Sequence, residues 1–142
     1  LESNLVRGRE LAAGAGAGYD GVTRADGLFT VSATPREGVT LAELEQAIQE
    51  ELTRLAQEPP SEAELRRVRA GVLSGQIYER DSLFGQAMSL GHLTALGVDW
   101  RLADQLLVKL EQVRAEDISR VARTWLVPDR LAVAHILPEV SP

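Results

Sequence analysis

The sequence predicts an α+β fold in which helices pack on one face of a largely antiparallel sheet. Two strand-like segments, residues 11–19 and 28–34, precede a block of four helical segments, and a third strand-like segment, residues 131–137, follows that block. Strands gathered at both ends of a helical block are typical of α+β layers. The last strand is therefore expected to return to the sheet that the first two begin.

The first two strands are predicted to pair as neighbours. Residues 11–19, LAAGAGAGY, alternate glycine with alanine, and glycine inside a strand marks the close approach of another backbone. The turn-forming pairs Asp20-Gly21 and Asp26-Gly27 separate this segment from residues 28–34, LFTVSAT. In the second segment apolar side chains alternate with hydroxyl side chains, which is typical of a strand with one covered face.

The first helix is predicted from its start signal, its apolar period and its stop signal. Thr40 and Glu43 form a capping box, in which the hydroxyl caps a free amide and the carboxylate reaches back to the chain. Pro59-Pro60 ends the helix. Between these signals, apolar residues recur every three or four positions, at Leu41, Leu44, Ile48, Leu52 and Leu55.

Three further helical segments follow. Ser61 and Glu64 repeat the capping box and open a helix that continues to about Leu96-Gly97, with a break near Asp81-Ser82. Asp99 or a close neighbour starts the third, and the fourth covers residues 115–126 up to Pro128-Asp129. Its predicted apolar face contains Ile118, Val121, Ala122 and Trp125.

Length and composition limit the class of protein. The 142 residues are predicted to form one domain, and 44% hydrophobic with 25% charged residues is typical of a globular chain. A net charge of −6 argues against a nucleic-acid partner, which requires a basic surface. No apolar run is long enough to span a bilayer, and cysteine is absent. The chain begins with Leu1 rather than Met, which indicates a processed chain or an excised fragment.

No catalytic constellation is predicted within the chain. His92 and His135 are the only histidines, and an H-x-x-E-H zinc motif is absent. A zinc site formed by both histidines and a carboxylate is geometrically conceivable. The favoured interpretation places His92 in a helix and His135 on the exposed side of a strand or packed on it. The neighbouring carboxylates Glu50 and Glu51 are interpreted as part of an exposed helix face.

Four segments carry a resemblance to a known family. They are LVRGRELAAGAGAGYD, GLFTVSATPREGVTLAELEQAIQEELTRL, PPSEAELRRVRAGVLSGQIYERDSLFGQAMSLGHLTALGVDWR and AEDISRVARTWLVPDRLAVAHILP. In this order and spacing they resemble the metal-free C-terminal half-domain of pitrilysin/insulinase-type zinc peptidases, notably the short bacterial branch. The resemblance implies a metallohydrolase half-domain fold like that of mitochondrial processing peptidase. It also implies that this chain is the C-terminal portion of a larger half-domain.

One feature of that family can be compared residue by residue. The metal-free half often carries an Arg and a Tyr that bind the substrate carbonyl and stabilise the oxyanion. Aligned on Leu5 and on Leu11-Ala12, the corresponding positions here are Val6 and Ala13, and neither side chain can donate a hydrogen bond. The pair is therefore expected to be lost, and the substrate-binding residues are expected to be Arg7, Arg9, Ala13 and Ala15.

The resemblance implies a role in a larger assembly. This segment is expected to be non-catalytic and to line the peptide-binding chamber, with no cofactor of its own. Zinc is expected in the N-terminal-type half-domain or in a homologous partner subunit of a homo- or heterodimer. The alternative is a catalytically inactive paralogue that acts as a structural or partner-binding scaffold. Bacterial relatives of this type are often exported, which favours the periplasm.

Overall fold

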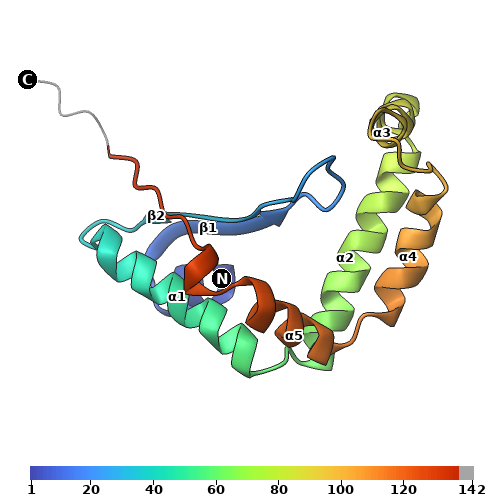
Figure 1. Cartoon of the computed structure of the whole chain (residues 1–142). Coiled ribbons are helices and arrows are strands. Elements are labelled where there is room, and N and C mark those ends of the chain that lie inside the picture. The colour runs from blue at the N-terminus through green and yellow to red at the C-terminus, as the bar shows by residue number, and fades with distance from the viewer. Residues whose placement is uncertain (138–142) are drawn as a thin grey trace, which may run out of the picture. The chain divides into compact units, whose positions relative to one another are not determined.

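A computed structural model describes residues 1–137, apart from the side chains of Gln76, Ile77, Glu79, Arg80, Ala103, Asp104, Leu106 and Leu107. The element order confirms the α+β prediction (Figure 1). A π-helix and a two-stranded sheet come first, and helices follow. In chain order the elements are η1 (Glu2–Gly8), β1 (Ala12–Tyr19), β2 (Phe29–Pro35), α1 (Leu41–Gln57), α2 (Glu62–Arg80), α3 (Leu83–Ala95), α4 (Leu102–Gln112), α5 (Ala115–Trp125) and η2 (Pro128–Arg130).

The chain divides into two compact units. The first comprises Leu1–Ala17, Val31–Glu58 and the chain from Ser119 onward. The second comprises Gly18–Thr30 and Pro59–Ile118. The base of the β-hairpin therefore belongs to the first unit, and its tip belongs to the helical second unit. None of the described helices is long and apolar enough to cross a membrane.

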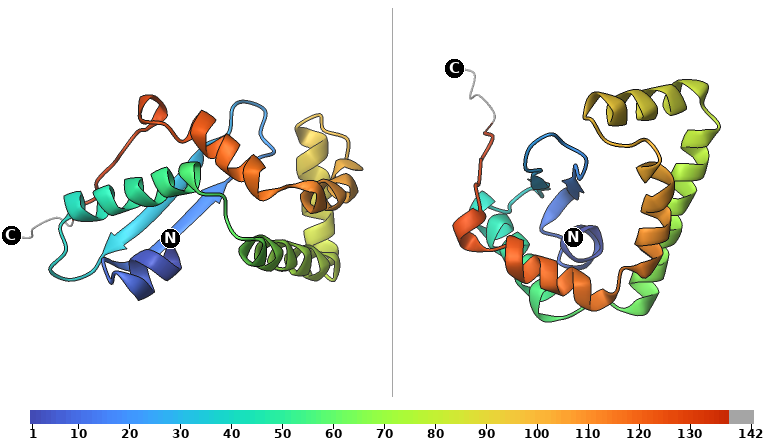
Figure 2. Two further views of the ribbon diagram at one scale, coloured as in Figure 1. Left: turned by 90° about the horizontal axis from the view of Figure 1, so that it is seen from below. Right: turned by 45° about the vertical axis from the view of Figure 1, so that its right-hand side comes forward.

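The core of the first unit joins η1, β1 and α1. Leu5, Ala12, Leu44 and Ala47 are buried together, and partly buried residues such as Ala15 and Ala33 pack around them. Figure 2 shows α1 and η1 alongside the two strands. The strands form an antiparallel hairpin, which confirms the predicted pairing of residues 11–19 with 28–34. Ala12 is the buried residue of β1, and its small side chain lets α1 and η1 approach the sheet closely.

The helix starts follow the local signals in the sequence. Thr40 and Glu43 form both bonds of the capping box: the Glu43 amide donates to the Thr40 hydroxyl at 3.2 Å, and the Thr40 amide donates to the Glu43 carboxylate at 2.8 Å. The Thr40 amide, followed by the Thr40 hydroxyl that donates to the same carboxylate oxygen at 2.7 Å, lowers the pKa of Glu43. Ser61 and Glu64 make the same pair of bonds at the start of α2. Both predicted capping boxes are confirmed.

Side chains from α5 cover the C-terminal end of α1. The last carbonyls of a helix have no partner within the helix and need one elsewhere. The buried Ser119 hydroxyl donates to the Leu55 carbonyl at 2.8 Å, and the Arg123 guanidinium donates to the Ala56 carbonyl at 2.9 Å. The buried face of α5 is therefore centred on Ser119 and Ala122. The predicted apolar face is wrong in part, because Val121 and Trp125 are exposed.

The second unit holds α2 against α3 and α4. The predicted break near Asp81-Ser82 is confirmed, since Ser82 caps the start of α3 by accepting from the Gly85 amide at 3.1 Å. Arg24 at the hairpin tip donates to the carbonyl of Ala95, the last residue of α3, at 2.9 Å. Arg69 of α2 similarly donates to the carbonyl of Val113, which follows α4. A cation at a helix C-terminus also complements the helix dipole.

The predicted closing strand, residues 131–137, does not join the sheet. The sheet within residues 1–137 consists of β1 and β2, and residues 131–137 lie outside any regular element. An alternating apolar pattern specifies an extended chain, but hydrogen bonding also requires an adjacent strand edge. In this structure the segment instead contacts α1, where His135 Nε2 lies 3.0 Å from a carboxylate oxygen of Glu45.

Candidate functional site

The four residues predicted to bind substrate lie close together in sequence at the start of β1. Arg7 is in the last turn of η1, Arg9 follows that helix, and Ala13 and Ala15 are in β1. Ala13 is exposed, whereas Ala15 is half-buried and packs against the core. Of the two alanines, Ala13 is therefore the one available to a ligand.

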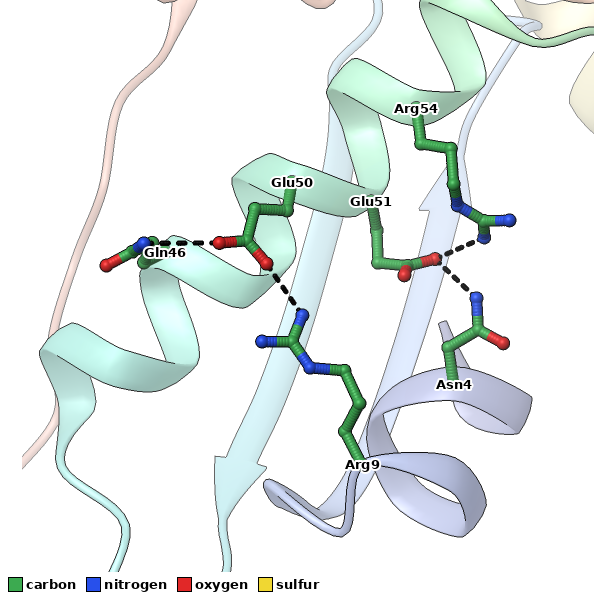
Figure 3. A network of polar contacts seen from close by, with 6 residues as sticks. All are labelled: Asn4, Arg9, Gln46, Glu50, Glu51 and Arg54. Atoms are coloured by element: carbon green, nitrogen blue, oxygen red, sulfur yellow. Dashed lines mark hydrogen bonds and ion pairs between the residues drawn. The ribbon is translucent and has the colours of Figure 1, made fainter.

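Arg9 is held by an ion pair with α1. Its guanidinium lies 2.7 Å from Glu50, whose other carboxylate oxygen accepts a hydrogen bond from Gln46 at 3.1 Å (Figure 3). The Arg9 hydrogen bond, followed by that of Gln46, lowers the pKa of Glu50. Arg7 pairs with Glu2 at 3.3 Å within η1. Both predicted cations thus have carboxylate partners within the chain, and an anionic ligand would have to displace them.

Glu51 joins η1 to α1 in the same network. Its side chain is only 12% exposed and accepts hydrogen bonds from Arg54 at 2.6 Å and from Asn4 at 2.8 Å (Figure 3). Burial raises the pKa of Glu51, but the Arg54 and Asn4 hydrogen bonds together with nearby positive charge outweigh it, so the net pKa is lowered. The interpretation of these carboxylates as part of an exposed helix face holds for Glu50, which is exposed, and is wrong for Glu51. Asn4 and Arg9 are visible in the sequence as polar residues that precede β1. The sequence does not show that they bind Glu51 and Glu50.

We expect the Glu51 network to stabilise the fold in a pH-dependent way. A lowered folded-state pKa contributes stability above the unfolded value of about 4.3, and this contribution is lost as pH falls through the folded pKa. Glu51→Gln is expected to cost about 1 kcal/mol at pH 7. The loss of unfolding free energy caused by this substitution should be smaller below pH 4. Urea unfolding of the variant and of wild type at pH 3 and pH 7 measures it.

An exposed residue without a described contact serves as the control for this measurement. Glu37→Gln, in the turn after β2, removes one negative charge and is expected to change stability little at either pH. If the difference between Glu51→Gln and wild type were the same at pH 3 and pH 7, the carboxylate form of Glu51 would not be the stabilising species.

Backbone geometry and crowding do not require glycine at two positions of β1. Gly14 and Gly16 are exposed, and a Cβ atom added at either would meet nothing within 4 Å. Neither has a positive φ angle, since the glycines with positive φ in the described chain are Gly38 and Gly97. β1 therefore presents backbone without side chains at these positions. Glycine in a strand commonly marks a site where a ligand or another backbone approaches.

The chain's own histidines do not fit a zinc-hydrolase site. His92 lies 3.3 Å from the Val22 carbonyl in the second unit, and His135 lies 3.0 Å from Glu45 in the first. Within the described residues no group of three or more His, Cys, Asp or Glu side chains could hold a metal ion. A hollow of about 360 Å³ on α1 is lined by residues of that one helix, from Gln46 to Gln57, and is a surface depression.

The fold and the candidate site define a class. The described chain is an α+β domain with small side chains along β1, and its sequence lacks an H-x-x-E-H motif. Residues 2–72 match the family model described as the Peptidase M16 inactive domain, and the chain belongs to this family. This match confirms the resemblance to the metal-free half of pitrilysin/insulinase-type peptidases.

Solved structures share the fold at low sequence identity. The inactive peptidase domain of a candidate zinc protease from Bordetella parapertussis is 23% identical, with a TM-score of 0.83 over 93% of this chain and 70% of that one. A candidate zinc protease from Bordetella pertussis Tohama I is 23% identical, with a TM-score of 0.78 over 90% and 70% of the two chains. A Helicobacter pylori protease is 19% identical, with a TM-score of 0.82 over 92% of this chain but only 31% of its own. No curated protein sequence matches significantly.

Proposed function

We propose that this chain is a non-catalytic segment of a zinc metallopeptidase and lines the chamber that binds the peptide. The observation that carries the proposal is β1, where Gly14 and Gly16 are exposed without any steric or conformational need for glycine in the described chain. An extended peptide can add to a sheet edge through main-chain hydrogen bonds, and such binding tolerates varied side chains. Small side chains along β1 leave room for that peptide.

The proposed assembly has two kinds of half-domain. The larger domain containing this chain carries helices on one face of a mainly antiparallel sheet, as in mitochondrial processing peptidase. An N-terminal-type half-domain or a homologous subunit holds zinc through H-x-x-E-H and performs the hydrolysis. The role of the present chain is to bind and orient the peptide, which lowers the entropic cost of reaction at the metal.

A catalytically inactive scaffold is the second candidate function. The observation in its favour concerns the two positions that align with the family's Arg and Tyr. Val6 packs against the core of the first unit and Ala13 is exposed, so neither can donate a hydrogen bond to a developing oxyanion. A partner chain that carries the Arg and Tyr would reconcile this loss with catalysis.

The test is zinc content of the native full-length protein together with cleavage of an unstructured peptide, with and without chelator. Under the proposal, about one zinc per catalytic half-domain and chelator-sensitive cleavage are expected. Zinc without cleavage would support a separate partner chain that supplies the Arg and Tyr. Absence of both would overturn the peptidase proposal and favour the scaffold.

A further inference from the structure

The tip of the β-hairpin holds an exposed aromatic ring between two glycines. Tyr19 is the last residue of β1 and is 65% exposed. A Cβ atom added at Gly21 would lie 3.1 Å from Cε1 of the Tyr19 ring, and one added at Gly27 would lie 3.2 Å from Cε2. The two glycines therefore lie against opposite edges of the ring and hold it in place, while the residue as a whole stays largely exposed.

The rest of the tip keeps this ring in position. A Cβ atom at Gly27 would overlap the carbonyl oxygen of Asp20, so the close approach of the two turns requires glycine there. Arg24 donates to the carbonyl that ends α3 at 2.9 Å, and His92 Nε2 of that helix lies 3.3 Å from the Val22 carbonyl. All of these residues belong to the second unit. A side chain held in this way loses little conformational freedom when a ligand binds.

The charged side chains of the tip favour a cationic ligand. Asp20 and Asp26 each directly precede one of the two glycines, and neither forms an ion pair with another described residue. Arg24 is the only cation in residues 20–28, and its guanidinium binds the end of α3. An apolar ligand would contact the ring but would leave both carboxylates without a counterion. A positively charged group therefore complements this surface better.

We propose that Tyr19 is a specificity-determining residue that binds a cationic side chain, lysine or arginine, of a peptide paired along β1. An ammonium or guanidinium group over an aromatic ring is attracted by the ring quadrupole. The carboxylates of Asp20 and Asp26 attract the same group, and the net charge of −6 favours the approach of a basic peptide. This inference rests on the proposed peptide-binding role of β1 and adds the class of side chain that the peptide carries.

Binding of two matched peptides to the native full-length protein tests the proposal. One is an unstructured alanine- and serine-based peptide that contains lysines, and the other carries uncharged norleucine at the same positions. Fluorescence anisotropy in the presence of chelator measures both affinities without cleavage. The lysine peptide is expected to bind about 5- to 10-fold more tightly at low ionic strength. Equal affinities would overturn the proposal.

Substitutions of tyrosine separate the effect of the ring from the general negative charge of the chain. Tyr19→Leu is expected to lower the ratio of the two affinities about threefold. Tyr19→Phe keeps the ring and should retain the ratio. Tyr78→Leu removes another exposed tyrosine of the second unit and is the matched control, which should leave the ratio unchanged. An unchanged ratio in Tyr19→Leu, or an equal loss in Tyr78→Leu, would overturn the role of the Tyr19 ring.

A charge substitution provides a second variant that leaves the ring untouched. The Asp26 side chain has no hydrogen bond or ion pair with the described residues, so Asp26→Ser should fold even where Tyr19→Leu does not. It is expected to lower the ratio about twofold, because one of the two carboxylates is lost. An unchanged ratio in this variant would overturn the choice of a cationic ligand.

Cleavage of the same peptides distinguishes failure of this inference from failure of the proposed function. A lysine preference that depends on Tyr19, in a protein that lacks zinc and cleaves neither peptide, would support this inference and overturn the peptidase proposal. Chelator-sensitive cleavage of both peptides with equal kcat/KM, in wild type and in Tyr19→Leu alike, would support the peptidase proposal and overturn this inference.

Discussion

Gly16→Val is expected to reduce peptide cleavage by the assembled protease about 10- to 100-fold while slightly stabilising the fold. A Cβ at Gly16 meets nothing within 4 Å in the described chain, and valine favours the extended conformation more than glycine does. The folded domain should therefore gain about 0.5–1 kcal/mol. A peptide strand added beside β1 would instead bring its neighbouring side chain on the same face against the isopropyl group, at a cost of about 1–3 kcal/mol.

The opposite signs of the two effects make this variant informative. The measurements are kcat/KM for an unstructured peptide and the Tm of the same preparation. Gly71→Ala in α2 is the matched control: a Cβ there also meets nothing within 4 Å, so it should raise stability by about 1 kcal/mol without changing cleavage. A stable Gly16→Val protein with wild-type cleavage would exclude β1 from the peptide site. Ala15 is a poorer position for this test because it is half-buried.

Local signals predicted most of the regular structure. A capping box involves residues three apart, so Thr40-Glu43 and Ser61-Glu64 could be recognised without knowledge of the fold. The hairpin was predictable for the same reason, because turn residues and period-two alternation lie within one short stretch. The π-helix η1 was not predicted, since its seven residues carry neither a capping signal nor an apolar period.

Long-range partners were the part that the sequence could not specify. Residues 131–137 have the pattern of a strand, yet a pattern does not state which edge the strand meets, and the hairpin is not its partner here. Glu50 and Glu51 look like solvated carboxylates on α1 until η1 brings Arg9 and Asn4 to them from more than forty residues away in sequence. For the same reason Arg9 could be chosen as a candidate, but its pairing with Glu50 could not be foreseen. The pairing of Arg7 with Glu2 is local, but it occurs within the π-helix η1, which was not predicted.

Ser119→Ala is expected to destabilise the protein by about 1–3 kcal/mol, since it removes the hydroxyl that donates to the Leu55 carbonyl from a buried position. Ser119 is 1% exposed, and its hydroxyl donates at 2.8 Å to the Leu55 carbonyl in the last turn of α1, where no amide of the helix is available.

Thr124→Ala is the matched control in the same helix. The Thr124 hydroxyl is exposed and donates to the Arg120 carbonyl, one turn earlier, at 2.9 Å. Loss of that local bond should change stability by less than about 0.5 kcal/mol, because the carbonyl stays accessible to other donors. Urea unfolding of both variants measures the difference. Equal and small effects would mean that the contact between α5 and the end of α1 depends on packing of Ala122 rather than on the serine hydrogen bond.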